Sequence, residues 1–100
     1  SIKGNVLAQA FYGVLSAIFD SGQDAEISPN FVAEMAIEIT KIIAEHSQVD
    51  WSSNKTIHDR IAQDIDDLFY QYEKERGLKL SFDTIDKIIE NVKTVALRRF

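Results

Sequence analysis

Apolar residues recur every three or four positions along most of this chain, and that spacing places side chains on one face of an α-helix. The pattern predicts four helices, over about Val6 to Phe19, from Pro29 to His46, over roughly Asn54 to Arg76, and after Ser81. It leaves little room for β-strands. The predicted fold is therefore all-α, a single four-helix bundle-like domain over residues 1–100 with a long third helix.

Each predicted helix has an apolar face, and we expect the four faces to form one core. These faces comprise Val6, Leu7, Ala10, Phe11, Val14, Leu15 and Ile18 in the first helix and Val32, Met35, Ala36, Ile39, Ile42, Ile43 and His46 in the second. They comprise Ile57, Ile61, Ile65, Leu68 and Tyr72 in the third, and Phe82, Ile85, Ile88, Ile89, Val92, Val95 and Ala96 in the fourth. A chain of 100 residues with 45% apolar residues is enough for one core and short for two.

Residues that favour helix ends stand at the predicted boundaries. Asn5 and Ser28 are expected N-caps, and Pro29 suits the first helical position because its missing N–H costs nothing there. Ser81 is the expected cap of the last helix. The third helix has three possible caps, which are Ser52, Ser53 and Asn54. Gly77 is expected to end the third helix in the left-handed conformation.

Three other features carry structural predictions. Asp20 to Asp24 contains glycine and short polar residues, which predict a loop. Gly13 lowers the stability of a helix interior, so we expect another helix to cross close to it. Trp51 is the only tryptophan and lies between the second and third helices, where we expect it to close the core as a structural joint. The alternative is that Trp51 contacts a partner.

The composition narrows the class of protein. The absence of cysteine removes disulfides, thiolate zinc sites and cysteine nucleophiles, and it fits a reducing compartment. For that reason we expect a cytoplasmic chain. No apolar run reaches the ~20 residues that span a bilayer, so we expect no membrane partner. Because the chain lacks an initiator methionine, we expect it to be an excised piece of a longer protein. Its net charge of -5 opposes nucleic-acid binding over the surface as a whole.

Candidate catalytic and metal-binding groups are few. Asp64, Asp66 and Asp67 lack the glycine turn and terminal glutamate of a calcium loop, and we interpret them as a solvated acidic face. His46 is expected to be partly buried at a helix end, and His58 lies on a different element. The glycines are scattered singly, so there is no phosphate-binding loop. We predict no catalytic, cofactor-binding or metal-ligating residue in this chain.

Two features suggest a contact surface. The first helix has almost no charge between Lys3 and Asp20, so we expect Tyr12 and Phe19 to lie uncovered and to contact a partner. The only concentration of positive charge is the end of the chain, Lys93, Arg98, Arg99 and Phe100. Cations stabilise a helix C-terminus by themselves, and the alternative is that this end docks on a protein or contacts phosphate.

Three segments also carry a family resemblance. They are Ala10 to Leu15, then Val49 to Trp51 followed by Ile61 to Leu68, and finally Phe82 with residues 85–90 running into Val95 to Phe100. In order and spacing these segments cover nearly the whole chain. Together they resemble the C-terminal helical region of the restriction (R) subunit of type I restriction-modification enzymes.

The resemblance implies a parent subunit with an endonuclease domain, two helicase-like ATPase motor domains and a C-terminal helical domain. In that family the last domain attaches the motor to a methyltransferase core made of modification and specificity subunits. The resemblance thus implies that this chain is a non-catalytic docking domain, which meets DNA only through the parent complex, a site-specific deoxyribonuclease. The alternative, from another class, is a helical nucleic-acid-binding module that uses Lys93, Arg98 and Arg99.

Overall fold

Four α-helices and one short 3-10 turn make up the part of the chain that the computed structural model describes, residues 2–21, 27–46 and 51–99. The elements are α1 (Ile2–Ser21), α2 (Pro29–His46), η1 (Trp51–Ser53), α3 (Lys55–Arg76) and α4 (Phe82–Arg99). The described residues contain no strand. The prediction of an all-α fold is confirmed, and α3, with 22 residues, is the longest described helix.

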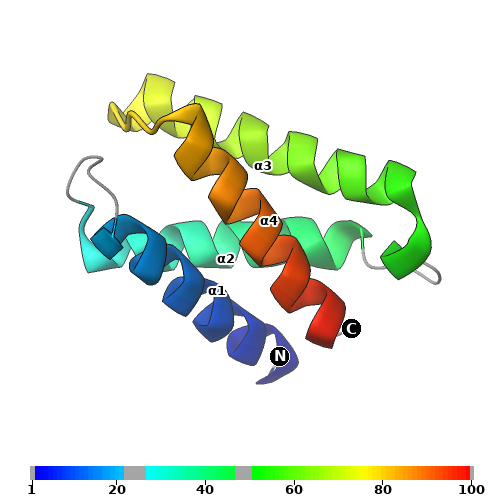
Figure 1. Cartoon of the computed structure of the whole chain (residues 1–100). Coiled ribbons are helices and arrows are strands. Elements are labelled where there is room, and N and C mark those ends of the chain that lie inside the picture. The colour runs from blue at the N-terminus through cyan, green and yellow to red at the C-terminus, as the bar shows by residue number, and fades with distance from the viewer. Residues whose placement is uncertain (1, 22–26, 47–50, 100) are drawn as a thin grey trace.

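The helices pack in a ring, in which α1 contacts α2 and α4, and α3 contacts the same two helices from the other side. Figure 1 shows α2 and α3 running in opposite directions, while α4 crosses in front of them at an oblique angle. The start of α1 and the end of α4 lie at one end of the molecule. The bundle is therefore splayed, since its helices do not share one axis.

The core is one cluster of buried side chains to which every helix contributes. Its members are Leu7, Phe11, Leu15, Val32, Met35, Ala36, Ile39, Ile43, Trp51, Ile61, Ile65, Phe69, Tyr72, Leu78, Ile88, Ile89, Val92 and Ala96. Most follow the predicted apolar faces, and Phe69 is a core residue that the predicted face of the third helix left out. Two predicted core residues are wrong: Val6 is 42% exposed and Phe82 is 86% exposed.

Capping side chains begin three of the described helices. Ser28 caps α2 because its Oγ accepts a hydrogen bond from the N–H of Phe31 at 3.2 Å, and Pro29 is the first helical residue. Among the three possible caps of α3, Asn54 takes the role, accepting from the N–H of Thr56 at 3.0 Å. The Oγ of Ser81 accepts from the N–H of Thr84 at 3.2 Å, so Ser81 caps α4 as predicted.

The two predictions about where the first helix begins and ends are wrong. Asn5 lies inside α1 because the helix begins earlier, at Ile2, so it is not the cap. The helix also continues through Asp20 to Ser21, which were predicted to be in a loop. The end of a helix commonly lies one or two residues away from the position that its apolar face suggests. Residues 22–24 of that predicted loop lie outside the described residues.

Trp51 closes the core where the chain passes from α2 to α3, as predicted. It begins η1 and is 5% exposed, and its ring meets that of His58 edge to face with centroids 5.7 Å apart. Val49 and Asp50, which precede it, lie outside the described residues.

A left-handed glycine ends α3, as predicted. Gly77 has φ 68°, and its N–H donates to the carbonyl oxygen of Tyr72. The N–H of Leu78 donates to the same oxygen at 3.4 Å, and the Leu78 side chain is 7% exposed within the core. The chain therefore turns sharply after α3 and anchors itself before α4 begins.

Gly13 contradicts the prediction of a close helix crossing. It lies on an exposed position of α1, and a Cβ atom placed there would have no neighbour within 4 Å. The helical pattern identifies the small residue but not which side of the helix faces a neighbour.

The two glycines predict substitution effects of opposite sign. Gly13→Ala should stabilise the protein by ~0.5–1 kcal/mol, because it lowers the entropy of the unfolded chain without a clash. Gly77→Ala should destabilise it by ~1 kcal/mol, because an L side chain is strained at this φ. Urea denaturation of both variants measures the difference. Equal effects at the two positions would contradict the helix-end geometry.

The raised pKa of Tyr72 predicts that the protein becomes less stable at high pH. Burial, and then the negative charges of Glu34 and Glu38, raise this pKa from 10.0 to about 12, while Arg76 opposes the rise. Between these values the unfolded chain loses the proton and the folded chain keeps it. Stability is therefore complete below pH of about 10 and falls by ~2–3 kcal/mol as the pH rises to about 12.

Denaturation of the Tyr72→Phe variant over this pH range is the test. The Tyr72 hydroxyl has no hydrogen-bond partner among the described residues, so the variant should be as stable as the parent near neutral pH. Its stability should fall less at alkaline pH. An identical pH dependence in the two proteins would show that Tyr72 is not the responsible group, because Tyr12 and Tyr70 remain in both.

Candidate docking surface

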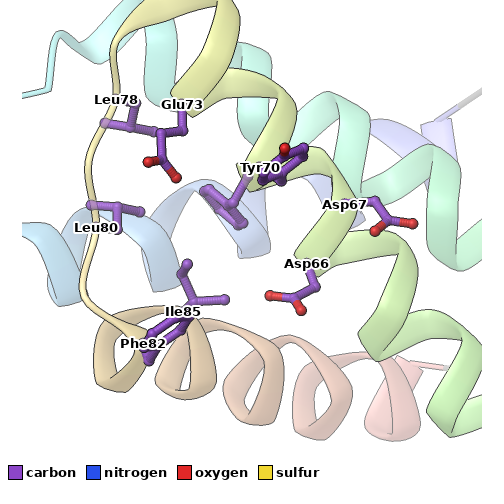
Figure 2. Close-up of a pocket in the computed structure, with 9 residues that line it drawn as sticks. Asp66, Asp67, Tyr70, Glu73, Leu78, Leu80, Phe82 and Ile85 are labelled. Carbon is purple, nitrogen blue, oxygen red and sulfur yellow. The ribbon is translucent and has the colours of Figure 1, made fainter.

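A small surface cavity with an apolar floor lies between α3 and the segment that follows it, and we call it the aromatic groove (Figure 2). Its lining residues are Asp66, Asp67, Phe69, Tyr70, Glu73, Leu78, Leu80, Phe82 and Ile85. Its volume is about 230 Å³. This volume lies below the ~300–1,000 Å³ of typical small-molecule sites, so the groove suits one or two side chains better than a whole cofactor.

The turn at Gly77 creates the groove. After Gly77, the buried Leu78 holds the chain against α3, and residues 79–81 run beside that helix without helical structure (Figure 2). Ser81 then caps α4, so Phe82 and Ile85 stand one turn apart on the same face of its first turn. The side chains of two successive elements thus meet over a short stretch of sequence.

Two aromatic rings at the groove are largely open to solvent. Phe82 is 86% exposed and Tyr70 is 62% exposed, which makes them the two most exposed large apolar residues among those described. Phe82 is the first residue of α4, so no earlier turn of its own helix covers it. Aromatic side chains grouped in this way are typical of protein contact surfaces.

Carboxylates border the groove. In Figure 2 the carboxylate of Asp66 points into the space near Ile85, that of Glu73 lies beside Leu78 and above Leu80, and that of Asp67 points away. Asp67 instead accepts a hydrogen bond from Gln63 at 2.9 Å. None of the described lining residues is a lysine or an arginine. The groove therefore combines an apolar floor with a negative rim.

The structure does not bring the predicted contact residues into one surface. Tyr12 and Phe19 are half-buried and pack against the core, so they are less open than the sequence suggests. Phe19 lies near the end of α1, whereas Arg98 is exposed at the end of α4, beside the start of α1 (Figure 1). Arg99 is the last residue of α4, and Phe100 lies outside the described residues.

Tyr12 does border a second, more open hollow. It lies between α1 and α2 and is lined by Ala8, Gln9, Tyr12, Ala33, Ala36 and Ile37. Ile37 is its most exposed large apolar residue, at 49%. This hollow has neither an aromatic ring as open as Phe82 nor a charged lining residue.

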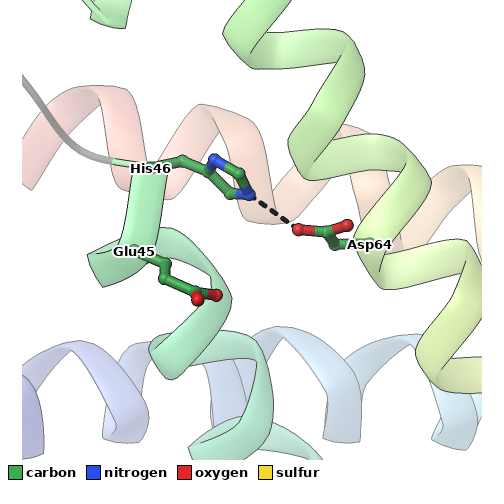
Figure 3. A group of neighbouring side chains, drawn as sticks. All are labelled: Glu45, His46 and Asp64. Carbon is green, nitrogen blue, oxygen red and sulfur yellow. Dashed lines mark hydrogen bonds and ion pairs between the residues drawn. The ribbon is translucent and has the colours of Figure 1, made fainter.

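The acidic cluster of α3 separates into two environments. Asp66 and Asp67 are exposed, as expected for a solvated face. Asp64 is half-buried, and its Oδ2 lies 2.6 Å from the Nε2 of His46, which is the last residue of α2 (Figure 3). The prediction that His46 is partly buried at a helix end is confirmed. The pair ties the end of α2 to the middle of α3.

Glu45 adds a third possible ligand atom beside this pair. Atoms of Glu45, His46 and Asp64 lie within 4.8 Å of one another, and imidazole with carboxylates is a ligand set that zinc accepts. The imidazole nitrogen that reaches Asp64 is already engaged in a short hydrogen bond. We therefore interpret the group as an interhelical contact, partly open to water.

The sequence contained a signal for the aromatic groove. Tyr70 does not lie on the apolar face that Ile61, Ile65 and Tyr72 define, and an aromatic residue off that face has no place in the core. Phe82 directly follows the cap Ser81, a position with no preceding helical turn. A pattern that assigns faces by spacing alone places Phe82 in the core.

Comparison of the chain with protein-family models, with curated proteins and with solved structures finds no match. None of the described helices is both long and apolar enough to cross a membrane.

Proposed function

We propose that this chain is a non-catalytic docking domain of a type I restriction enzyme R subunit. It attaches the parent subunit, an ATP-dependent DNA translocase and endonuclease, to a methyltransferase core of modification and specificity subunits. The domain itself provides a binding surface, and DNA is reached through the parent complex. The family part of this proposal comes from the resemblance of three sequence segments.

The observation that supports docking is the exposure of the aromatic groove. Leaving Phe82 86% exposed forgoes a large part of the ~1.5–3 kcal/mol that burial of such a side chain provides. A partner that covers Phe82 and Tyr70 would recover this free energy. Interface residues that contribute most to binding are often aromatic side chains of this kind, seated near a hollow.

The arrangement of the three resembling segments also supports the proposal. The first provides Phe11 and Leu15 to the core, and the second provides Trp51, Ile61 and Ile65. The third provides Ile88, Ile89 and Ala96. Segments that are far apart in the sequence therefore build one core, as expected if they belong together in one domain.

The positive end of the chain gives the nucleic-acid alternative less support. Lys93 is already paired with Glu90 at 3.1 Å, which leaves Arg98 as the exposed cation of that end among the described side chains. With a net charge of -5, the chain should show no salt-dependent shift of a labelled DNA duplex.

Deletion of residues 1–100 from the parent subunit should abolish its co-purification with the methyltransferase. The free subunit should still bind ATP, because the motor domains lie elsewhere in that family. A truncated subunit that assembles normally would contradict the docking function.

A matched pair of point variants locates the surface. Phe82→Ser should weaken assembly at least about tenfold, as loss of an interface aromatic does. Ile37→Ser removes an exposed apolar side chain from α2, away from the groove, and should leave assembly unchanged. Both variants should retain the helical circular-dichroism spectrum, since neither side chain belongs to the core.

A further inference from the structure

We infer that the aromatic groove binds a protein segment in which one apolar side chain lies between two lysine or arginine residues. This inference rests on the proposed docking function and specifies the chemistry of the partner. It follows from the size of the groove, the order of side chains along its rim and the absence of internal partners for its carboxylates.

The size of the groove calls for a single anchor. About 230 Å³ accommodates one large apolar side chain such as leucine or phenylalanine. Leu80 and Ile85 provide apolar walls, and Phe82 stands at the edge, where it can cover the inserted side chain (Figure 2). The anchor of the partner should therefore be one aliphatic or aromatic residue.

The rim sets the spacing of the charges. Asp66, Tyr70 and Glu73 are four and then three positions apart, so they share one face of α3. At 1.5 Å per residue, the two carboxyl-bearing residues are ~10 Å apart along the helix axis, with the tyrosine between them. Two cations at that separation, on either side of the anchor, would meet both carboxylates.

These carboxylates have no partner within the described part of the chain. Neither Asp66 nor Glu73 forms a side-chain hydrogen bond or an ion pair with another described residue. By contrast, Glu34 pairs with Arg76 at 2.8 Å. The negative rim is therefore available to an external cation.

The same rim selects against other occupants. Phosphate groups of nucleic acid or of anionic lipids would be repelled by Asp66 and Glu73. One cation of the chain is near: the Nζ of Lys74 lies 5.5 Å from the ring centroid of Tyr70. It occupies one cation–π position and leaves both rim carboxylates free.

The test uses a fluorescein-labelled, alanine-based helical peptide with two arginines two turns apart and a phenylalanine midway between them. Fluorescence anisotropy measures its binding to the 100-residue chain. Replacing the phenylalanine with alanine, or both arginines with glutamine, should each weaken binding about tenfold. Unchanged binding of either modified peptide would overturn the inference.

Two variants of the chain separate rim recognition from general attraction to an acidic protein. Glu73→Lys reverses a charge at the groove, and Glu75→Lys makes the same change two positions along α3, on another face. Glu73→Lys should weaken peptide binding about tenfold, and Glu75→Lys less than about twofold. Equal losses would show that only net charge attracts the peptide and would overturn the inference.

The same charge variants in the parent complex separate this inference from the proposed function. If Phe82→Ser disrupts assembly and Glu73→Lys does not, the docking function stands and the basic partner is wrong. If the peptide results hold while the domain-deleted subunit still assembles, the preference of the groove stands and the proposed function is wrong.

Discussion

The left-handed turn at Gly77, with the burial of Leu78 directly after it, is the constraint on which the second half of the molecule depends. Because Gly77 ends α3 with φ 68°, the chain reverses there. Because Leu78 is held in the core, α4 must start beside α3 and cross toward α1. That path carries Val92 into the shared core and leaves Phe82 outside it. The fold and the aromatic groove thus have one local origin.

Much of this fold can be predicted from the sequence, since helical spacing, caps and a terminating glycine are local signals. The apolar faces of α2 and α3, the caps Ser28 and Ser81 and the turn at Gly77 follow from neighbouring residues alone. The misassigned positions depend on tertiary contacts. Gly13 is a small residue of the kind found where two helices cross closely. The other helices, however, decide which side of α1 faces a neighbour, and Gly13 lies on an open side.

The candidate site was harder to predict, because an exposed side chain and a core side chain can share one spacing. Phe82 is in phase with Ile85 and Ile89, yet it lies at the very start of α4, before the helix reaches the core. Tyr12 differs from its prediction in the opposite direction. Its uncharged sequence neighbours suggest an uncovered side chain, but packing against α2 half-buries it. In both cases the position of the residue along its helix decides whether its side chain is buried, and the periodicity of apolar residues does not give that position.

An acidic domain that docks through a negative, aromatic surface would use apolar burial for affinity and charge for choice of partner. The most direct measurement is photo-crosslinking from benzoylphenylalanine placed at position 82 in the parent subunit, co-expressed with the modification and specificity subunits. The docking proposal predicts a crosslink from position 82 to one of these subunits and none from position 37, which is also exposed but lies away from the groove. Crosslinks from position 37 without any from position 82 would contradict it.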